Sequence, residues 1–314
     1  LDGVRVIDLS RVLAGPFCGM LLSDMGADVI KVEDTGAGDE SRTWPPHKEG
    51  ESAAFLVINR NKRDLTLDLK APEGAEILKT MVKRADVLIE NFRTGTMESF
   101  GLGYDALSAI NPGLVYCSIS AFGRTGPRKD GAGYEALMQA FSGIMSITGE
   151  PDGPPVRAGV SFLDLTTGIF SAFGIVNALL HRAKTGVGQR VDGSLLETAV
   201  TLLNYHAEGF LLTGAEPKAL GSSHPSLAPY RNFRCRDGQC VFIAGANDRF
   251  WQRLVAALDL GAMRDDERFA KNLGRVRHRN EVEAAVADAI GKLDREPLLK
   301  LLEDAGVPAT PVNT

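Results

Sequence analysis

The chain has 314 residues, a formal net charge of −5 and a hydrophobic fraction of 44%. That length allows two domains or one large one, and that composition is sufficient for a sizeable core. Because the chain has no run of basic residues, nucleic acid is not expected as a partner. We identify no segment long and apolar enough to span a bilayer, so no membrane partner is expected either.

The first half of the chain alternates strand-like and helix-like segments. The apolar patterns predict strands at residues 4–9, 29–33, 65–69, 87–90 and 114–119, and helices at 15–25 and 72–84. Such alternation is typical of an α/β fold, here a doubly wound and mostly parallel sheet covered by helices on both faces.

The second half is richer in helices. The patterns predict long apolar helices at 169–182 and 195–212, a hairpin at 232–244, and helices at 248–258, 281–293 and 295–305. Residues 214–229 are rich in Gly, Ser, Pro and Ala. We therefore predict a large domain over 1–213, a linker over 214–229 and a small α/β domain over 230–314.

The four cysteines indicate neither a metal site nor a disulfide framework. They form no CxxC pair and have no His at metal-ligand spacing. Asp237-Gly238 predicts a tight turn that brings Cys235 and Cys240 together as reduced neighbours. Since the N-terminal residues have a strand pattern and not that of a signal peptide, we expect a cytoplasmic location.

Asp164 is the most informative single residue. It stands just before an apolar run that continues to Leu180. A poorly hydrated carboxylate at a helix start, close to backbone N–H donors, can act as a covalent nucleophile. An Asp at this place is more often an N-cap, and the residue alone leaves both interpretations open.

Two further segments follow strands of the predicted sheet. Gly15-Pro16 opens a helix after the first strand, and Asn91-Phe92 follows the strand at 87–90. Ligands of open α/β sheets bind at such carboxyl ends. Because the chain has neither GxGxxG nor a phosphate-binding GKS/T loop, a usual dinucleotide or nucleoside triphosphate site is not expected.

Together these segments resemble the family III CoA transferases, typified by formyl-CoA transferase and carnitine CoA-transferase. The matching stretches run through essentially the whole chain, in order: 1–9, 14–16, 22–33, 59–70, 85–92, 123–127, 133–135, Asp164, 185–189 and 229–230. The resemblance implies an enzyme that moves CoA from an acyl-CoA donor to a carboxylic acid. It also implies an interlocked homodimer, and family members continue past the position of Thr314 to return to the large domain.

The resemblance also implies roles for individual residues. The position of Asp164 is the family's nucleophile, which forms a mixed anhydride with the donor acyl group and then an aspartyl-CoA thioester. Glu135 matches an acidic residue near that carboxylate. The CoA cleft corresponds to Val12, Leu13, Ala14, Leu67, Lys70, Asn91, Phe92 and Tyr134. CoA and acyl-CoA are then substrates, and no tightly bound cofactor or metal is expected.

The chain departs from formyl-CoA transferase at three positions that bear on the CoA phosphates. It has Arg11, Asp34 and Ser99 in place of His, Arg and Arg. Arg42, Lys62 and Arg63 are candidates to replace the missing cations.

Two alternative functions belong to other classes. The 2-methylacyl-CoA racemases share the fold but have Gly-His-Asp where this chain has Gly133-Tyr134-Glu135. Because Tyr is a poor base at neutral pH, that position favours the transferase. A non-catalytic CoA-binding protein is the other alternative.

Overall fold

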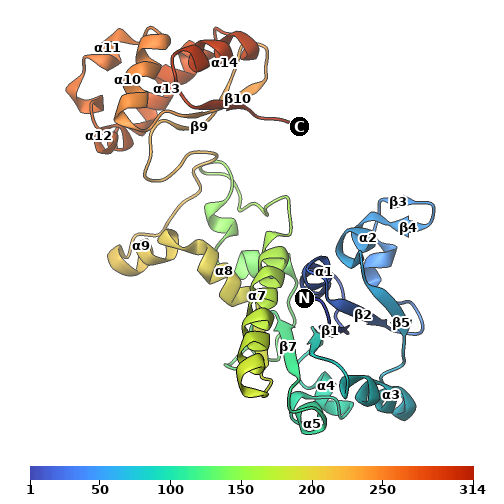
Figure 1. Ribbon diagram of the computed structural model, residues 1–314. Helices are drawn as coiled ribbons and strands as arrows, with labels where there is room; N and C mark the ends of the chain where they lie inside the picture. The colour runs from blue at the N-terminus through green and yellow to red at the C-terminus, as the bar shows by residue number, and fades with distance from the viewer. The chain divides into compact units, whose positions relative to one another are not determined.

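The computed structural model describes all residues from Leu1 to Thr314 and forms two compact units (Figure 1). The first contains Leu1–Met145 and Arg157–Glu216, and the second contains Ser146–Val156 and Pro217–Thr314. The sequence predicts one continuous large domain over 1–213. The structure differs because residues 146–156 leave the first unit and pack with the second.

A parallel sheet forms the centre of the first unit. Its strands, in spatial order, are β5 (Arg63–Thr66), β2 (Asp28–Glu33), β1 (Arg5–Asp8), β6 (Val87–Glu90), β7 (Val115–Ser120) and β8 (Arg190–Ser194). All neighbouring pairs are parallel. The predicted α/β fold with a doubly wound parallel sheet is confirmed. The strand β8 was not predicted, because RVDGS contains no apolar run.

Helices cover both faces of this sheet. The helices of the first unit are α1 (Ala14–Asp24), α2 (Ala53–Asn59), α3 (Pro72–Val82), α4 (Thr96–Ser99), α5 (Tyr104–Ile110), α6 (Glu135–Phe141), α7 (Phe162–Thr185), α8 (Leu195–Leu203) and α9 (Tyr205–Thr213), and the unit also contains a 3-10 turn η1 (Glu40–Thr43) and the hairpin β3 (His47–Lys48) and β4 (Glu51–Ser52). The buried side chains of α1 and α7 pack on one face of the sheet, and those of α3 and α5 pack on the other.

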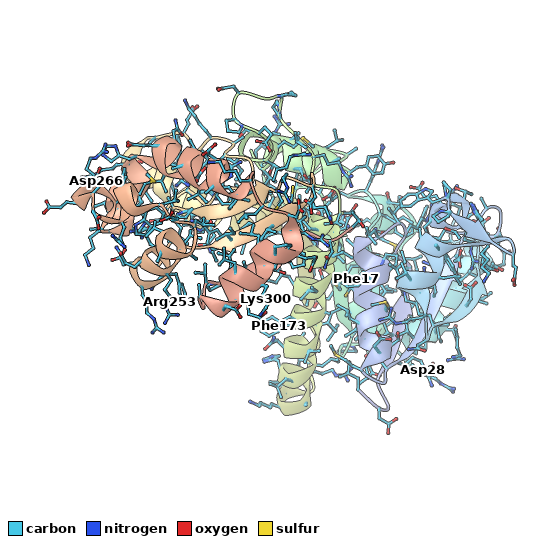
Figure 2. The ribbon with its side chains drawn as sticks, turned by 90° about the horizontal axis from the view of Figure 1, so that it is seen from above. Phe17, Asp28, Phe173, Arg253, Asp266 and Lys300 are labelled. Carbon is cyan, nitrogen blue, oxygen red and sulfur yellow. The ribbon has the colours of Figure 1, made fainter.

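Helices α1 and α7 lie side by side, and Figure 2 labels Phe17 on the first and Phe173 on the second. Only glycine fits at position 168, because a Cβ there would lie 2.8 Å from the carbonyl oxygen of Ala14. This close approach brings the first turn of α7 next to the start of α1.

Helix α7 is long and apolar enough to cross a membrane by length and composition, so the sequence expectation that no such segment exists is wrong by that criterion. In the structure, the buried side of α7 packs against α1 and the sheet. The other predicted long helix, over 195–212, is broken into α8 and α9 at Asn204, whose φ is 41°.

The second unit is a small α/β arrangement with its own core. Its elements are β9 (Tyr230–Arg234), β10 (Cys240–Ala244), α10 (Asp248–Ala257), α11 (Gly261–Arg264), η3 (Glu267–Phe269), α12 (Asn272–Arg277), α13 (Arg279–Ile290), α14 (Arg295–Asp304) and β11 (Ala309–Pro311). The predicted hairpin is present as antiparallel β9 and β10, and β11 adds a third strand. Cys240 pairs with Arg234, so Cys235 lies one residue into the turn, and both cysteines are free.

The strand order places a topological switch point between β1 and β6. From β1 the chain proceeds outward to β2 on one side, whereas β6, β7 and β8 follow on the other. Crevices at the carboxyl ends of such strands are the usual ligand sites of doubly wound folds. The segments that follow β1 and β6 therefore mark the place for a site.

Candidate functional site

A pocket of about 160 Å³ lies at this switch point in the first unit. Its polar and charged side chains are Asn91, Ser120, Tyr134, Glu135 and Asp164. The remaining lining residues are small or apolar: Val12, Leu13, Ala14, Ile119, Ala121, Gly133 and Leu195.

Asp164 is the third residue of α7, so it belongs to the first helical turn. The N-cap residue of that helix is Ser161, so the interpretation of Asp164 as an N-cap is wrong. Burial, and secondarily the nearby charge of Glu135, raise the pKa of Asp164 to about 7, against the opposing effect of Arg157. A carboxyl group with this pKa is partly protonated near neutrality and is only weakly solvated as an anion.

Glu135 is the second acid of the pocket, and only one of its two carboxylate oxygens accepts a hydrogen bond. Gln139 donates from Nε2 to Oε1 of Glu135 at 2.6 Å, and the Gln139 amide oxygen accepts from the backbone N–H of Ala158 at 3.0 Å. The other carboxylate oxygen, Oε2, has no hydrogen-bond partner although it is buried. Buried carboxylate oxygens are rarely left in this state, so a donor from a ligand fits here.

Arg157 is the cation next to these two acids. Its Nε lies 3.7 Å from Oε2 of Glu135, and its side chain is 43% exposed. It also donates from Nη2 to Oγ of Ser161 at 3.2 Å. The ion pair with Glu135 is long and the guanidinium is accessible, so Arg157 can change partners when an anion enters.

The segment 10–14 forms one wall of the pocket, and side chains from distant parts of the chain hold its backbone. Asn91 accepts from the N–H of Arg11 and donates to its carbonyl oxygen, both at 2.8 Å. Asp39 accepts from the N–H of Val12 at 3.2 Å. Val12 has a φ of 72°, which is rare for a β-branched residue.

A second hollow, of about 250 Å³, lies on the other side of this segment. Leu67, Lys70 and Phe92 line it together with Arg11 and Asp34. The guanidinium of Arg11 lies 5.0 Å from the centre of the Phe92 ring. Segment 10–14 is therefore the partition between the two hollows, with Arg11 on one side and Val12 on the other.

The residues predicted to bind CoA fall into two groups on either side of this partition. Val12, Leu13, Ala14, Asn91 and Tyr134 share the first pocket with Asp164 and Glu135. Leu67, Lys70 and Phe92 line the second hollow. The sequence placed all ten residues in one site, and the structure brings them to one edge of the sheet.

The three suggested replacement cations are already engaged. Lys62 is 2% exposed and pairs with Asp8 at 2.8 Å. Arg42 pairs with Glu33 and Asp64. Arg63 begins β5 and pairs with Asp28 at 2.8 Å, at the amino ends of the strands and therefore at the edge away from the pocket. The cations that border the second hollow are Arg11 and Lys70, and both are exposed.

Sequence reasoning missed Arg157, Lys31 and Asp39. Arg157 lies in an irregular segment with no motif around it. The position of Lys31 could have indicated a buried cation, because Lys31 interrupts the apolar residues of the buried strand β2. No group of three or more His, Cys, Asp or Glu side chains is placed to hold a metal ion.

Comparison with known proteins decides the family. The model of CoA-transferase family III matches residues 1–314. The chain belongs to this family. The chain is 45% identical to the succinate–glutarate CoA-transferase of Agrobacterium fabrum, and the match covers all of this chain and 80% of that relative. It is 43% identical to the succinyl-CoA:mesaconate CoA-transferase of Haloarcula hispanica, and the match covers 99% of this chain and 80% of that relative.

A solved structure supports the same assignment. The crystal structure of a CAIB/BAIF family protein from Brucella suis superposes with a TM-score of 0.89 at 44% identity, covering all of this chain and 84% of that one. The protein is therefore a CoA transferase of family III, and the racemase and non-catalytic alternatives are set aside.

Proposed function

We propose that this family III enzyme transfers CoA between dicarboxylic acids through covalent intermediates on Asp164. The observation that carries the proposal is Asp164 itself, a carboxylate whose pKa is raised to about 7 by burial and by Glu135, in a pocket at the switch point. Poor solvation of the anion makes it a better nucleophile toward a thioester.

The reaction can be written with Asp164 alone as nucleophile. A carboxylate oxygen of Asp164 attacks the donor thioester carbonyl, the C–S bond breaks, and CoA thiolate leaves a mixed anhydride. The thiolate then attacks the Asp164 carbonyl carbon of that anhydride, which releases the donor acid and leaves an aspartyl-CoA thioester. The acceptor carboxylate attacks this thioester, and the thiolate finally attacks the acceptor acyl carbon. The cycle ends with the acceptor CoA ester and a free Asp164, with no net proton change.

Two helix starts supply dipoles for the oxyanions of these steps. Helices α1 and α7 begin at the pocket with Ala14 and Asp164 on its wall, and neither N-cap side chain makes a capping hydrogen bond. Backbone N–H groups at helix starts are favourable partners for developing negative charge. Gly15 allows this geometry, because a Cβ there would lie 2.3 Å from the Cβ of Ser10.

The pocket also supports the choice of dicarboxylic acids. A second carboxylate enters a space that already holds Asp164 and Glu135, so it needs a cation. Arg157 is next to both acids, and its exposed guanidinium can contact a carboxylate through two hydrogen bonds. The named reactions of the two relatives above involve succinyl-CoA, succinate, glutarate or mesaconate, all of which are or carry dicarboxylic acids.

The test uses succinyl-CoA as donor and follows CoA ester exchange by mass spectrometry. We expect Asp164→Asn to lower turnover by at least about 1,000-fold with the fold intact. Near wild-type turnover by this variant would overturn the covalent mechanism.

The substrate class is tested with glutarate and pentanoate, which differ by one carboxylate. Because Arg157 also lowers the pKa of Asp164, Arg157→Met affects both acids, but we expect kcat/KM to fall about tenfold or more further for glutarate than for pentanoate, with Arg157→Lys in between. Equal losses for both acids would remove Arg157 as the dicarboxylate contact.

A further inference from the structure

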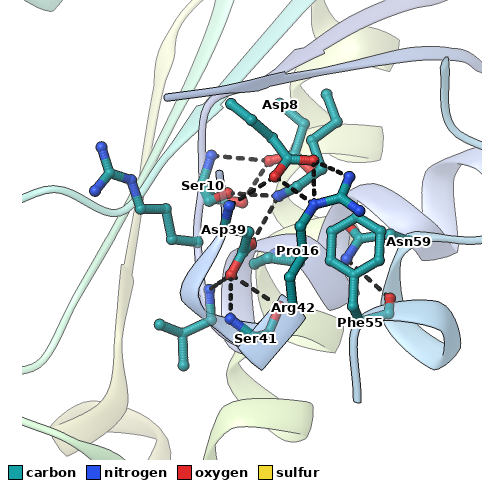
Figure 3. A network of polar contacts seen from close by, with 12 residues as sticks. Asp8, Ser10, Pro16, Asp39, Ser41, Arg42, Phe55 and Asn59 are labelled. Carbon is teal, nitrogen blue, oxygen red and sulfur yellow. Dashed lines mark hydrogen bonds and ion pairs between the residues drawn. The ribbon is translucent and has the colours of Figure 1, made fainter. Parts of the chain in front are cut away.

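A buried ion pair lies beneath the partition between the two hollows. Lys31 of β2 and Asp39, the residue before η1, are joined at 2.9 Å, and their side chains are 2% and 0% exposed. Figure 3 labels Asp39 together with Ser41 and Ser10. Burial acts to raise the pKa of Asp39, but Lys31 and the hydrogen bonds from Ser41 outweigh it and hold the pKa below its usual value. The pair is therefore charged inside the protein, where both charges need partners.

Apart from the hydrogen bonds that Ser41 donates to Asp39, the partners of this pair are backbone groups of the partition. Lys31 donates from Nζ to the carbonyl oxygen of Ser10 at 3.0 Å. Asp39 accepts from the N–H of Val12 at 3.2 Å. The two residues thus contact the chain on either side of Arg11, whose own N–H and carbonyl are bonded to Asn91.

Val12 needs this support because its backbone conformation is unfavourable. A φ of 72° places it in the left-handed region, where a branched Cβ crowds the backbone. Strained residues of this kind persist only where surrounding contacts determine them, and they gather at functional sites. Val12 is on the wall of the Asp164 pocket.

We propose that Lys31 and Asp39 are positioning residues, which hold Val12 in its left-handed conformation and so fix the pocket wall that faces Asp164. Their side-chain contacts to the partition are at Ser10 and Val12, whereas the backbone of Arg11, which lines the second hollow, is bonded to Asn91. This inference rests on the proposed function in one respect, namely that acyl transfer takes place at this wall.

A second buried pair, Lys62 and Asp8, makes no contact to Val12; Figure 3 labels Asp8. Lys62 and Asp8 are 2% and 0% exposed, as deeply buried as Lys31 and Asp39. Lys62 donates to the carbonyl oxygen of Pro16, within α1, and Asp8 accepts from the N–H of Ser10. Asp8 thus bonds the same residue, Ser10, as Lys31 does, but neither Lys62 nor Asp8 contacts Val12, so this pair is a control for the loss of the Val12 contact.

The experiment replaces both charges together, because removing one alone leaves a buried unpaired charge. The variant Lys31→Met/Asp39→Asn keeps an amide oxygen for the N–H groups of Val12 and Ser41, whereas Lys31→Met/Asp39→Leu removes the acceptor of both. We expect the Leu variant to lose kcat by about ten- to a hundredfold, with KM for succinyl-CoA changed by less than about threefold. The Asn variant is expected to keep kcat within about threefold of wild type.

A double-mutant cycle with Val12→Gly separates positioning from stability. Glycine adopts the left-handed conformation without steric penalty, so the Leu variant should lose much less kcat in the Val12→Gly background. The control Lys62→Met/Asp8→Asn should show no such coupling. Urea unfolding of every variant shows that the assays use folded protein.

Two outcomes overturn the inference: equal losses in the Asn and Leu variants, or losses that are purely additive with Val12→Gly. Failure of the covalent mechanism is seen separately, because it depends on Asp164→Asn and leaves the comparison among these variants unaffected.

Discussion

Replacing Asp164 by Asn should make the protein more stable, and increasingly so as the pH rises. Burial and Glu135 raise the pKa of Asp164 from 3.8 to about 7. The folded protein therefore holds a proton on this group at pH values where the unfolded chain has released it. Since stability falls with pH wherever the folded state binds more protons, this carboxyl group destabilises the fold as pH rises from about 4 to about 7. Asn has no such titration.

The size of the effect follows from the shift. One pKa unit corresponds to about 1.4 kcal/mol, so three units set an upper limit of about 4 kcal/mol. Asp164 is half-buried and faces an open pocket, and solvent screening reduces the value, so we expect about 1–2 kcal/mol above pH 7. An ionised Asp in a first helical turn contributes about 0.3–1 kcal/mol in the opposite direction, which is smaller than the burial effect.

The assay is urea unfolding of wild type and Asp164→Asn at pH 5, 6, 7 and 8. The difference in free energy of unfolding should grow in favour of the variant up to pH 7 and then level off. A difference that is constant across this range, or one that favours wild type at pH 8, would refute the reasoning about burial.

Three further predictions concern rate, binding and assembly. Because Asp164 must be ionised to attack, kcat/KM should rise with pH through about 7. The variant Glu135→Gln should move the midpoint of that pH profile lower while leaving it above the ordinary Asp range. An unmoved midpoint would contradict the role given to Glu135. The variant Lys70→Glu should weaken CoA binding measured by calorimetry, whereas Arg63→Glu should leave it unchanged because Arg63 lies at the opposite edge of the sheet. Equal effects of the two variants would mean that CoA binds elsewhere. Leu211 is 76% exposed on the apolar helix α9, so we expect a homodimer by light scattering of the full-length protein, and a monomer mass would contradict it.

The sequence predicted the strands β1, β2, β6 and β7 well because they are short apolar runs. The strand predicted at 65–69 lies instead at Arg63–Thr66, whose residues RDLT are all exposed, and β8 was not predicted because its residues RVDGS have no apolar pattern. The break between α8 and α9 was also not predicted, because the apolar pattern continues across Asn204 and does not indicate the positive φ of that residue.

The site was predicted in part, and for a different reason. The family resemblance brought Asp164, Glu135 and the cleft residues together, but the residues that hold the pocket lie far apart in the chain. Lys31 and Asp39 were not predicted as a pair, because charged residues usually indicate solvated surface. Lys62 was misread for the same reason, and the structure shows its charge satisfied by Asp8 inside the protein.

The central claim is that the acyl group and CoA pass through covalent bonds to Asp164. The most direct measurement adds hydroxylamine during turnover with succinyl-CoA and glutarate, and then locates modified residues by peptide mass spectrometry. Hydroxylamine attacks the aspartyl thioester or anhydride carbonyl, so we expect a hydroxamate on Asp164 that accumulates only when acyl-CoA is present, together with loss of activity. Continued turnover with an unmodified Asp164 peptide would contradict it.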